Sequence, residues 1–274
     1  MKIIRFSDGE GAVHFGIDTG AGDAEILAQD PLKGISPTGR RAHVRTILSP
    51  ISPSNIFCIG LNYRRHAEET GAAIPEHPVV FMKATSAVIG PGGAIRLPRS
   101  QMRGPEVDYE AELAVVIGTR AKDVSPERAL EHVLGYTVAN DVSARRWQKL
   151  GGGGQWVRGK TFDTFCPLGP CIVTPEEISD PQDLDIRAAL NGKTMQKSNT
   201  RDMIFSVADL IARLSTDTTL LPGTIILTGT PEGVGFARKP PVYLAPGDEI
   251  SVGIDGIGVL TNPVVGGDVL RDRT

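Results

Sequence analysis

Short apolar runs separated by turn residues are the feature that most limits how this chain of 274 residues can fold. The chain contains 32 glycines and 20 prolines, which interrupt long helices and favour turns. No uninterrupted apolar stretch approaches the length of about 18 residues that a membrane-spanning helix needs. The sequence therefore predicts many short strands with a few helices, in an α+β or mixed-β fold built on a rolled or barrel-like sheet.

A proline-rich segment predicts two domains. Residues 49–53 (SPISP) have the composition of a linker. Residues 1–50 before it are expected to form a small N-terminal domain, in which Lys2–Phe6 and Ala12–Ile17 pair as a hairpin. Residues 55–274 after it are expected to form one catalytic domain, since this length is enough for a single large core.

The catalytic part shows clear signals for helices and strands. Ser125 is a good N-cap for a helix over Pro126–Val133, and Met203–Leu214 has the pattern of an amphipathic helix. A strand over Leu184–Leu190 ends at Asn191-Gly192, a strong hairpin signal. Further strands are predicted at Asn55–Gly60, Val79–Met82, Glu110–Ile117, Tyr136–Asn140, Thr224–Leu227, Glu249–Ile254 and Gly258–Leu260.

Charge and cysteine content exclude several classes of protein. The formal net charge of -3 gives no strong field for nucleic acid or an anionic membrane, so neither is an expected partner. Cys58, Cys166 and Cys171 are odd in number and lack zinc-binding spacing, which favours three reduced thiols. The N-terminus has no apolar core or cleavage site of a signal peptide. We therefore expect a cytoplasmic protein.

An alternating run of acidic residues is the most suggestive chemical feature. Asp108, Glu110 and Glu112 would share one face of a strand, where like charges require a counter-charge. A divalent cation would supply it, although three carboxylates on a solvated face are an equally simple reading. Asp141 directly follows the apolar run at 136–139, an unusual place for an unpaired charge. The absence of nearby histidine or cysteine favours Mg²⁺ or Mn²⁺ over zinc.

Six short motifs follow one another along the second part of the chain. They are Cys58–Glu69 (CIGLNYRRHAEE), Phe81–Lys83 (FMK), Asp108–Leu113 (DYEAEL), Asn140–Arg145 (NDVSAR), Gly159–Asp163 (GKTFD) and Thr228–Pro231 (TGTP). In this order they resemble the fumarylacetoacetate hydrolase family over about residues 55–265. The resemblance implies the family's rolled β-sheet barrel and a homodimer, and the first 50 residues resemble the family's small N-terminal domain only loosely.

The resemblance also implies roles for single residues. Metal ligands are expected at Glu110, Glu112 and Asp141, holding Mg²⁺ or Mn²⁺, with Ca²⁺ as a substitute in crystals. Gly60–Asn62 supplies no carboxylate, so the chain is similar to the family's short, three-carboxylate type. The expected catalytic residues are His66, Glu69 and Lys160, and the expected substrate-binding residues are Lys83, Gln148 and Thr230. The residues that remain open as pocket walls are Arg145, Trp147, Trp156 and Arg158.

These expectations have a physical basis. His66 and Glu69 are three residues apart, so on a helix they share a face and the carboxylate can orient the imidazole as a general base. A metal bound to both oxygens of a 2-keto acid stabilises an enolate. The sequence favours hydrolysis of a C–C bond in a 2,4-diketo acid such as an acylpyruvate or fumarylpyruvate. The alternative is a decarboxylase, isomerase, lyase or hydratase on a related 2-keto acid, for example oxaloacetate or a hydroxymuconate derivative.

Two competing classes of function carry less support. Residues 154–161 match the nucleotide-binding pattern GxxxxGK[ST], but a charged segment precedes them and Pro167 prevents a following helix. A nucleotide site is therefore rejected. A binding protein without catalytic activity is disfavoured by the complete acidic triad and by Lys160.

Overall fold

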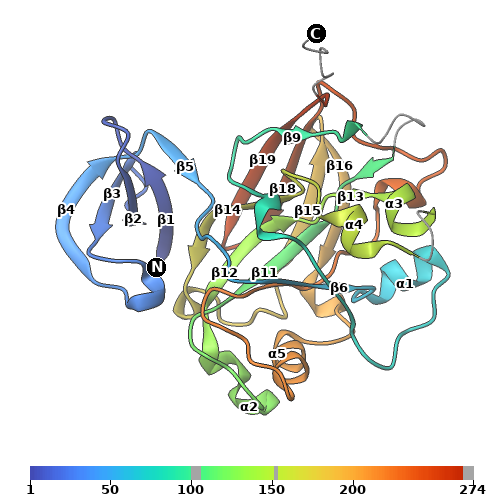
Figure 1. Cartoon of the computed structure of the whole chain (residues 1–274), viewed down its shortest axis with the longest axis horizontal. Helices are drawn as coiled ribbons and strands as arrows, with labels where there is room; N and C mark the ends of the chain where they lie inside the picture. Colours follow the sequence, from blue (N-terminus) through green and yellow to red (C-terminus); the bar gives the residue numbers. More distant parts are fainter. Residues whose placement is uncertain (100–105, 151–153, 268–274) are drawn as a thin grey trace, which may run out of the picture.

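The computed structural model describes residues 1–99, 106–150 and 154–267. A small β-rich unit lies beside a larger body, at the left of Figure 1. The small unit begins with the predicted hairpin, in which Phe6 pairs with His14. Its strands are β1 (Lys2–Ser7), β2 (Val13–Asp18), β3 (Asp23–Leu27), β4 (Pro37–His43) and β5 (Thr46–Leu48).

One sheet of 12 strands runs through both parts of the chain, because β1 pairs with β14 (Cys166–Val173) of the larger part. Its main path is β4-β3-β2-β1-β14-β12-β11-β17-β6-β7. The short β8 (Val88–Ile89) pairs with β14. The remaining strands are β12 (Val133–Asn140), β11 (Ala111–Ile117), β17 (Ile225–Leu227), β6 (Ile56–Gly60) and β7 (Val79–Met82).

A second sheet of five strands packs against the centre of the first, where β15 and β18 contact β11 and β12. Asn191 and Gly192 turn its hairpin with φ values of 50° and 77°, as the sequence predicts. Its strands, in order, are β16 (Lys193–Asn199), β15 (Asp185–Leu190), β18 (Glu249–Ile254), β19 (Gly258–Val265) and β9 (Ile95–Arg96).

Every residue of β11 is buried, because neighbouring strands and the second sheet enclose it. Full burial of each valine or leucine side chain contributes about 1.5–3 kcal/mol. A polar residue in this strand is therefore held rigidly and needs partners. A separate two-stranded ladder joins β10 (Val107–Asp108) to β13 (Ser143–Ala144) just beyond the ends of β11 and β12.

The helices are short, and the bounds of two of them differ from the predicted ones. α2 (Pro126–Ala129) ends early and continues as a 3₁₀ turn, and Ser125 makes no capping hydrogen bond. α5 (Val207–Ser215) begins four residues later than predicted, because Ser206 and Asp209 form a capping box at its start. The remaining helices are α1 (Arg64–Thr70), α3 (Arg145–Leu150) and α4 (Trp156–Lys160).

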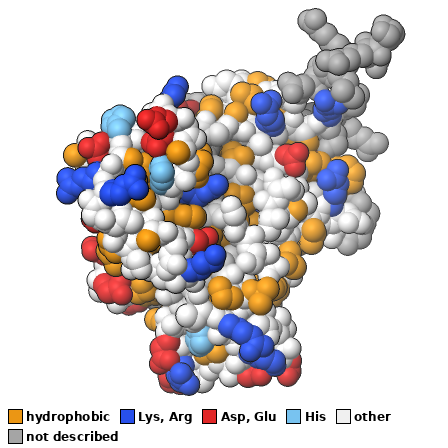
Figure 2. All heavy atoms as spheres, turned by 60° about the vertical axis from the view of Figure 1, so that its left-hand side comes forward, with side chains coloured by type: hydrophobic (Ala, Val, Ile, Leu, Met, Phe, Trp, Pro, Cys, Tyr) orange, Lys and Arg blue, Asp and Glu red, His pale blue; other side chains and the backbone are white. Residues whose placement is uncertain are grey.

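The distribution of charge on the surface is consistent with the small net charge of the sequence. Acidic and basic side chains are interspersed on the face shown in Figure 2, with no field of one sign. Within the described ranges, no helix is long and apolar enough to cross a membrane. The three cysteines are buried and free, as predicted.

Candidate active site

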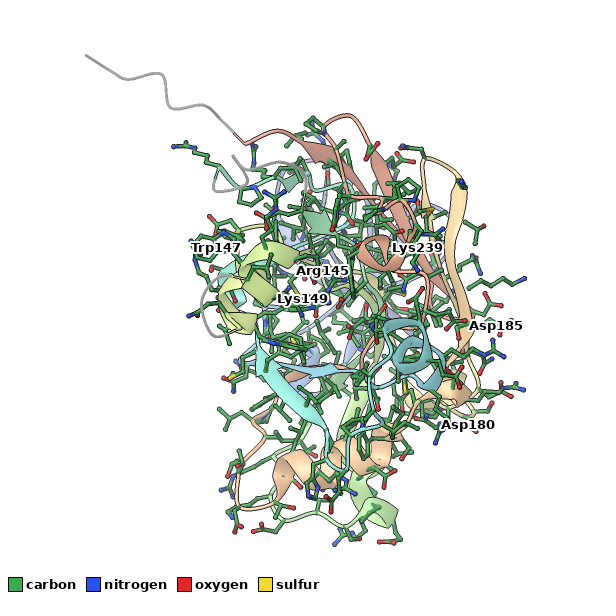
Figure 3. All side chains as sticks on the ribbon, turned by 90° about the vertical axis from the view of Figure 1, so that its right-hand side faces the viewer. Arg145, Trp147, Lys149, Asp180, Asp185 and Lys239 are labelled. Atoms are coloured by element: carbon green, nitrogen blue, oxygen red, sulfur yellow. The ribbon has the colours of Figure 1, made fainter. Side chains whose placement is uncertain are left out.

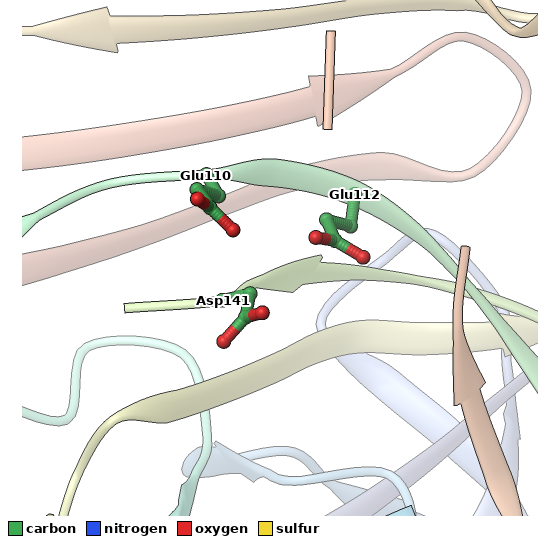
Figure 4. Close-up of side chains that lie close together, drawn as sticks. All are labelled: Glu110, Glu112 and Asp141. Atoms are coloured by element: carbon green, nitrogen blue, oxygen red, sulfur yellow. The ribbon is translucent and has the colours of Figure 1, made fainter. Parts of the chain in front are cut away.

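Three carboxylates meet where β11 and β12 pair (Figure 4). Glu110 precedes β11, Glu112 is its second residue, and Asp141 directly follows β12. The antiparallel register pairs Glu112 with Ala139, which brings Asp141 beside the two glutamates. One oxygen from each carboxylate lies within 4.8 Å of the others, and all three residues are buried. The structure thus brings the three predicted ligands together.

The carboxylates are unequally neutralised. Lys160 Nζ lies 2.7 Å from both Glu110 Oε2 and Asp141 Oδ2. Burial would raise the pKa of Glu110, but Lys160 and Arg145 lower it to about 2. Burial, with the charges of Asp141 and Glu110, holds the pKa of Glu112 well above its usual value. Among the described residues, no cation forms an ion pair with Glu112, so its charge is the one left uncompensated when all three carboxylates are ionised.

This donor set fits a hard divalent cation. Mg²⁺ and Mn²⁺ prefer carboxylate oxygens, whereas zinc sites usually contain histidine or cysteine, and the described cluster consists of carboxylates alone. Three protein ligands leave further positions of an octahedral ion for water or substrate. Glu110, Glu112 and Asp141 are therefore the residues that would hold the metal.

Lys83, expected from the resemblance to bind substrate, lies behind Asp141 and does not line the cavity. Its ammonium group is fully buried and lies 2.5 Å from Asp141 Oδ1. It also donates to the carbonyl oxygen of Val142 at 3.1 Å. Lys83 thus positions Asp141 from behind and has no surface in the cavity described below.

Asp108 does not join the acidic triad, which corrects a second expectation. It belongs to β10, and the chain breaks strand geometry before β11, so the alternation of faces does not extend to it. Its carboxylate accepts hydrogen bonds from the backbone N–H groups of Gly235 and Phe236 at 2.8 and 3.0 Å. Arg145 Nε donates to it at 2.9 Å. Asp108 therefore positions a turn and an arginine.

The helix α3 brings three polar residues to the cavity, namely the predicted Gln148, the open candidate Arg145, and Lys149, which the sequence analysis missed. Arg145 Nη1 lies 2.7 Å from Glu110 Oε1 and donates to Gln148 Oε1 at 2.9 Å. Arg145, Gln148 and Lys149 follow i, i+3 and i+4 spacing, so they share one face of α3. This spacing was the available signal for the missed Lys149.

The helix α1 places the predicted His66–Glu69 pair over the site. His66 Nδ1 lies 3.2 Å from Glu69 Oε2, and His66 is buried. Glu69 Oε1 accepts a hydrogen bond from the backbone N–H of Gly233 at 2.9 Å. Burial would raise the pKa of Glu69, but these two contacts lower it. The carboxylate is therefore ionised and fixes the orientation of the imidazole ring.

A cavity of about 320 Å³ unites most of these residues. Of the predicted site residues, His66, Glu110, Gln148, Lys160 and Thr230 line it. Of the open candidates for its walls, Arg145 and Trp156 line it, whereas Trp147 and Arg158 do not. The sequence did not single out two further lining residues, Lys149 and Phe236.

Two other features define the limits of the site. Thr230 Oγ1 accepts a hydrogen bond from Gln196 Nε2 at 2.8 Å, so a residue of the second sheet positions the predicted substrate contact. A larger recess of about 890 Å³ lies between the linker, β5 and β8 and contains none of the carboxylates of the triad. The chemistry of the chain is therefore in the smaller cavity.

Comparisons with known proteins match both parts of the chain. The family model described as fumarylacetoacetate (FAA) hydrolase C-terminal matches residues 55–265, and the Rv2993c-like N-terminal model matches residues 1–50. A mitochondrial oxaloacetate tautomerase from Xenopus laevis is 51% identical over 221 residues, which cover 80% of this chain and 68% of that protein. A human mitochondrial oxaloacetate tautomerase is 46% identical over 246 residues, covering 89% and 77%.

Solved structures extend the likeness to the whole fold. The crystal structure of 5-carboxymethyl-2-hydroxymuconate delta-isomerase from Mycobacterium smegmatis has a TM-score of 0.85 at 42% identity, covering 97% of this chain and 100% of that one. A fumarylacetoacetate hydrolase from Exiguobacterium antarcticum has a TM-score of 0.85 at 39% identity, covering 97% and 99%. The α+β architecture with a small N-terminal domain is thus the fold that the sequence predicts. The chain belongs to the fumarylacetoacetate hydrolase family.

Proposed function

We propose that this protein interconverts the keto and enol forms of a small 2-keto acid, with oxaloacetate as the first candidate, in a reaction that depends on a divalent metal. The observation that carries the proposal is the buried triad of Glu110, Glu112 and Asp141, which adjoins a cavity lined by His66 and Lys160. Relatives named tautomerase and isomerase support this reaction above the hydrolysis that the sequence favours.

The residues of the site have distinct parts in this reaction. A bound divalent ion supplies Lewis acidity, which stabilises the negative charge that develops on the keto oxygen during enolisation. Lys160 lines the cavity and adds a fixed positive charge beside two carboxylates of the triad, where it favours the developing negative charge of the enolate. His66 lines the cavity and is the group that takes the proton from the carbon next to the carbonyl of the keto form and gives it back in the reverse direction, while the enolate oxygen exchanges its proton with solvent. Glu69 orients its ring.

The test follows the ultraviolet absorbance of enol-oxaloacetate. Wild-type protein with Mg²⁺ is expected to accelerate loss of the enol band, and excess EDTA is expected to abolish the acceleration. Glu110→Gln should abolish it too, because it removes a charged ligand of the metal. Glu249→Gln, an exposed change on β18, is the matched control and should keep full activity. Acceleration that persists in EDTA or in Glu110→Gln would refute the metal assignment.

Hydrolysis of an acylpyruvate is the second candidate, and the His66–Glu69 pair supports it. A fixed imidazole–carboxylate pair with a contact of 3.2 Å is an arrangement that activates water. Acetylpyruvate and fumarylpyruvate absorb as conjugated enols, so cleavage removes their bands and releases pyruvate. Measuring pyruvate from these compounds and from oxaloacetate separates hydrolysis, decarboxylation and simple tautomerisation.

A further inference from the structure

Two cations of α3 face the cavity from one side of a short helix. Arg145 and Lys149 are four residues apart, and both belong to the lining of the cavity that contains Glu110. Figure 3 shows the two side chains on neighbouring turns of α3. Like charges at this spacing disfavour a helix, so the pair requires compensating anions.

The two cations differ in their partners. Arg145 is buried and lies 2.8 Å from Asp108 and 2.7 Å from Glu110. Lys149 lies at the exposed mouth of the cavity, and no carboxylate of the described residues is within ion-pair distance of it. Its Nζ lies 3.6 Å from the centroid of the Phe236 ring. Burial and the charge of Arg145 lower the pKa of Lys149. An aromatic ring alone compensates this charge weakly.

The balance of charges around the cavity indicates what kind of group Lys149 can bind. The triad and the side chains that form ion pairs around it comprise four carboxylates and three cations, namely Asp108, Glu110, Glu112 and Asp141 with Lys83, Arg145 and Lys160. The buried carboxylate of Glu106 is outside this set, because it accepts a hydrogen bond at the start of α3. A divalent ion bound to the ionised triad leaves this set with one positive charge in excess, which one carboxylate of a substrate balances. Lys149 then remains as a further positive charge at the mouth, with no carboxylate of the described part of the chain in an ion pair with it.

We propose that Lys149 binds the distal carboxylate of a dicarboxylic 2-keto acid and so determines the specificity of the site. This inference rests on the proposed function, since it concerns the substrate of the same cavity. Phe236 holds the ammonium at the mouth, and Asp108 fixes Phe236 through its backbone N–H. An incoming carboxylate offers Lys149 a charge-assisted hydrogen bond, which is stronger than its contact with the ring.

The kinetic test compares oxaloacetate with its 4-ethyl ester, in which the distal carboxylate is neutral. Lys149→Met keeps an unbranched apolar side chain without the charge. We expect it to raise KM for oxaloacetate by about 10- to 100-fold with little change in kcat, the loss typical of a hydrogen bond to a charged group. KM for the ester should not change. Lys149→Arg should retain most of the affinity, and Lys193→Met, an exposed change on β16, is the matched control.

A binding measurement separates this inference from the proposed reaction. Calorimetry in Mg²⁺ compares 3,3-difluorooxaloacetate, which has two carboxylates and no enolisable proton, with oxalate, which has no distal group. Lys149→Met should weaken the first by about 10- to 100-fold and leave oxalate unchanged. Equal effects on both ligands, or no effect on either, would overturn the role of Lys149. If the wild-type protein turns over neither substrate, the proposed reaction is refuted. The binding comparison still tests the role of Lys149 in that case.

Discussion

At the scale of single residues, the site is defined by how each buried charge is compensated. Glu110 has two cations beside it, whereas Glu112 accepts a hydrogen bond from the backbone N–H of Gly229 at 2.7 Å. Burial and the neighbouring carboxylates therefore favour the protonated form of Glu112, and its pKa is raised. A metal ion reverses this preference, so protonation and metal binding compete at one side chain.

The raised pKa of Glu112 predicts how metal affinity depends on pH. In the metal-free protein, folding favours the protonated carboxyl, so this contribution to stability is complete below the ordinary pKa and is lost as pH rises through the raised one. Mg²⁺ must displace that proton, so its affinity should increase as pH rises above the ordinary pKa of a glutamate carboxyl. Calorimetric titrations in two buffers with different ionisation enthalpies should detect the released proton. Affinity that is independent of pH, with no proton released, would contradict this account of Glu112.

Loss of the Asp108 carboxylate is expected to affect both the stability of the fold and the binding of substrate. Asp108→Asn leaves the buried guanidinium of Arg145 with one carboxylate and weakens the anchoring of the Gly235–Phe236 turn. We expect the free energy of unfolding to fall by about 3–5 kcal/mol and KM to rise. Urea denaturation measures the first effect. Asp183→Asn, which breaks an exposed pair with Arg201, should cost far less, because solvent screens the pair. Equal losses in the two variants would rule out a special role for Asp108.

At the scale of elements, strands were easier to predict than the helix that shapes the cavity. The apolar runs of β6, β7, β11 and β12 are local signals, and the register of β11 with β12 assembles the metal triad. The start of α3 has no local cap. Glu106 supplies it from a distant segment, because its carboxylate accepts a hydrogen bond from the N–H of Arg146 at 2.8 Å. A sequence pattern cannot show a cap that the tertiary fold provides.

His66 and Glu69, both on α1, are expected to contribute to kcat to different extents. His66→Gln should lower kcat by about 10²- to 10⁴-fold, because it removes the group that transfers the proton. Glu69→Gln should lower it less, since the imidazole remains but loses an oriented, ionised partner. Mg²⁺ affinity, measured by calorimetry, should be unchanged in both variants. A loss of metal binding in His66→Gln would show instead that α1 supports the carboxylate triad.

At the scale of the whole molecule, the N-terminal unit is an extension of the catalytic sheet. Residues Lys2 and Ile3 of β1 pair with β14, and Ile3, Ile4 and Phe6 are buried. The linker composition at residues 49–53 indicated a boundary, but the pairing of β1 with β14 has no local signal, because it joins residues about 170 positions apart. A homodimer and a cytoplasmic location stay predictions.

This pairing predicts the effect of removing residues 1–50. The deletion should lower the melting temperature and promote aggregation, because it exposes an edge of β14 and the apolar surface that covers it. Thermal unfolding and size-exclusion chromatography of the shortened chain test this. A shortened chain that is monodisperse and melts at the temperature of the full chain would show that the two parts are independent.

The central claim is that Glu110, Glu112 and Asp141 bind a metal that promotes enolisation of a 2-keto acid, whatever reaction follows. Exchange of the C3 protons of oxaloacetate with deuterium, followed by NMR in D₂O, measures that step directly. After subtraction of the spontaneous rate, we predict rapid exchange with wild-type protein and Mg²⁺, and none with EDTA or with Glu110→Gln. Exchange that continues without metal, or an absence of exchange in the Mg²⁺-loaded wild-type protein, would contradict the claim.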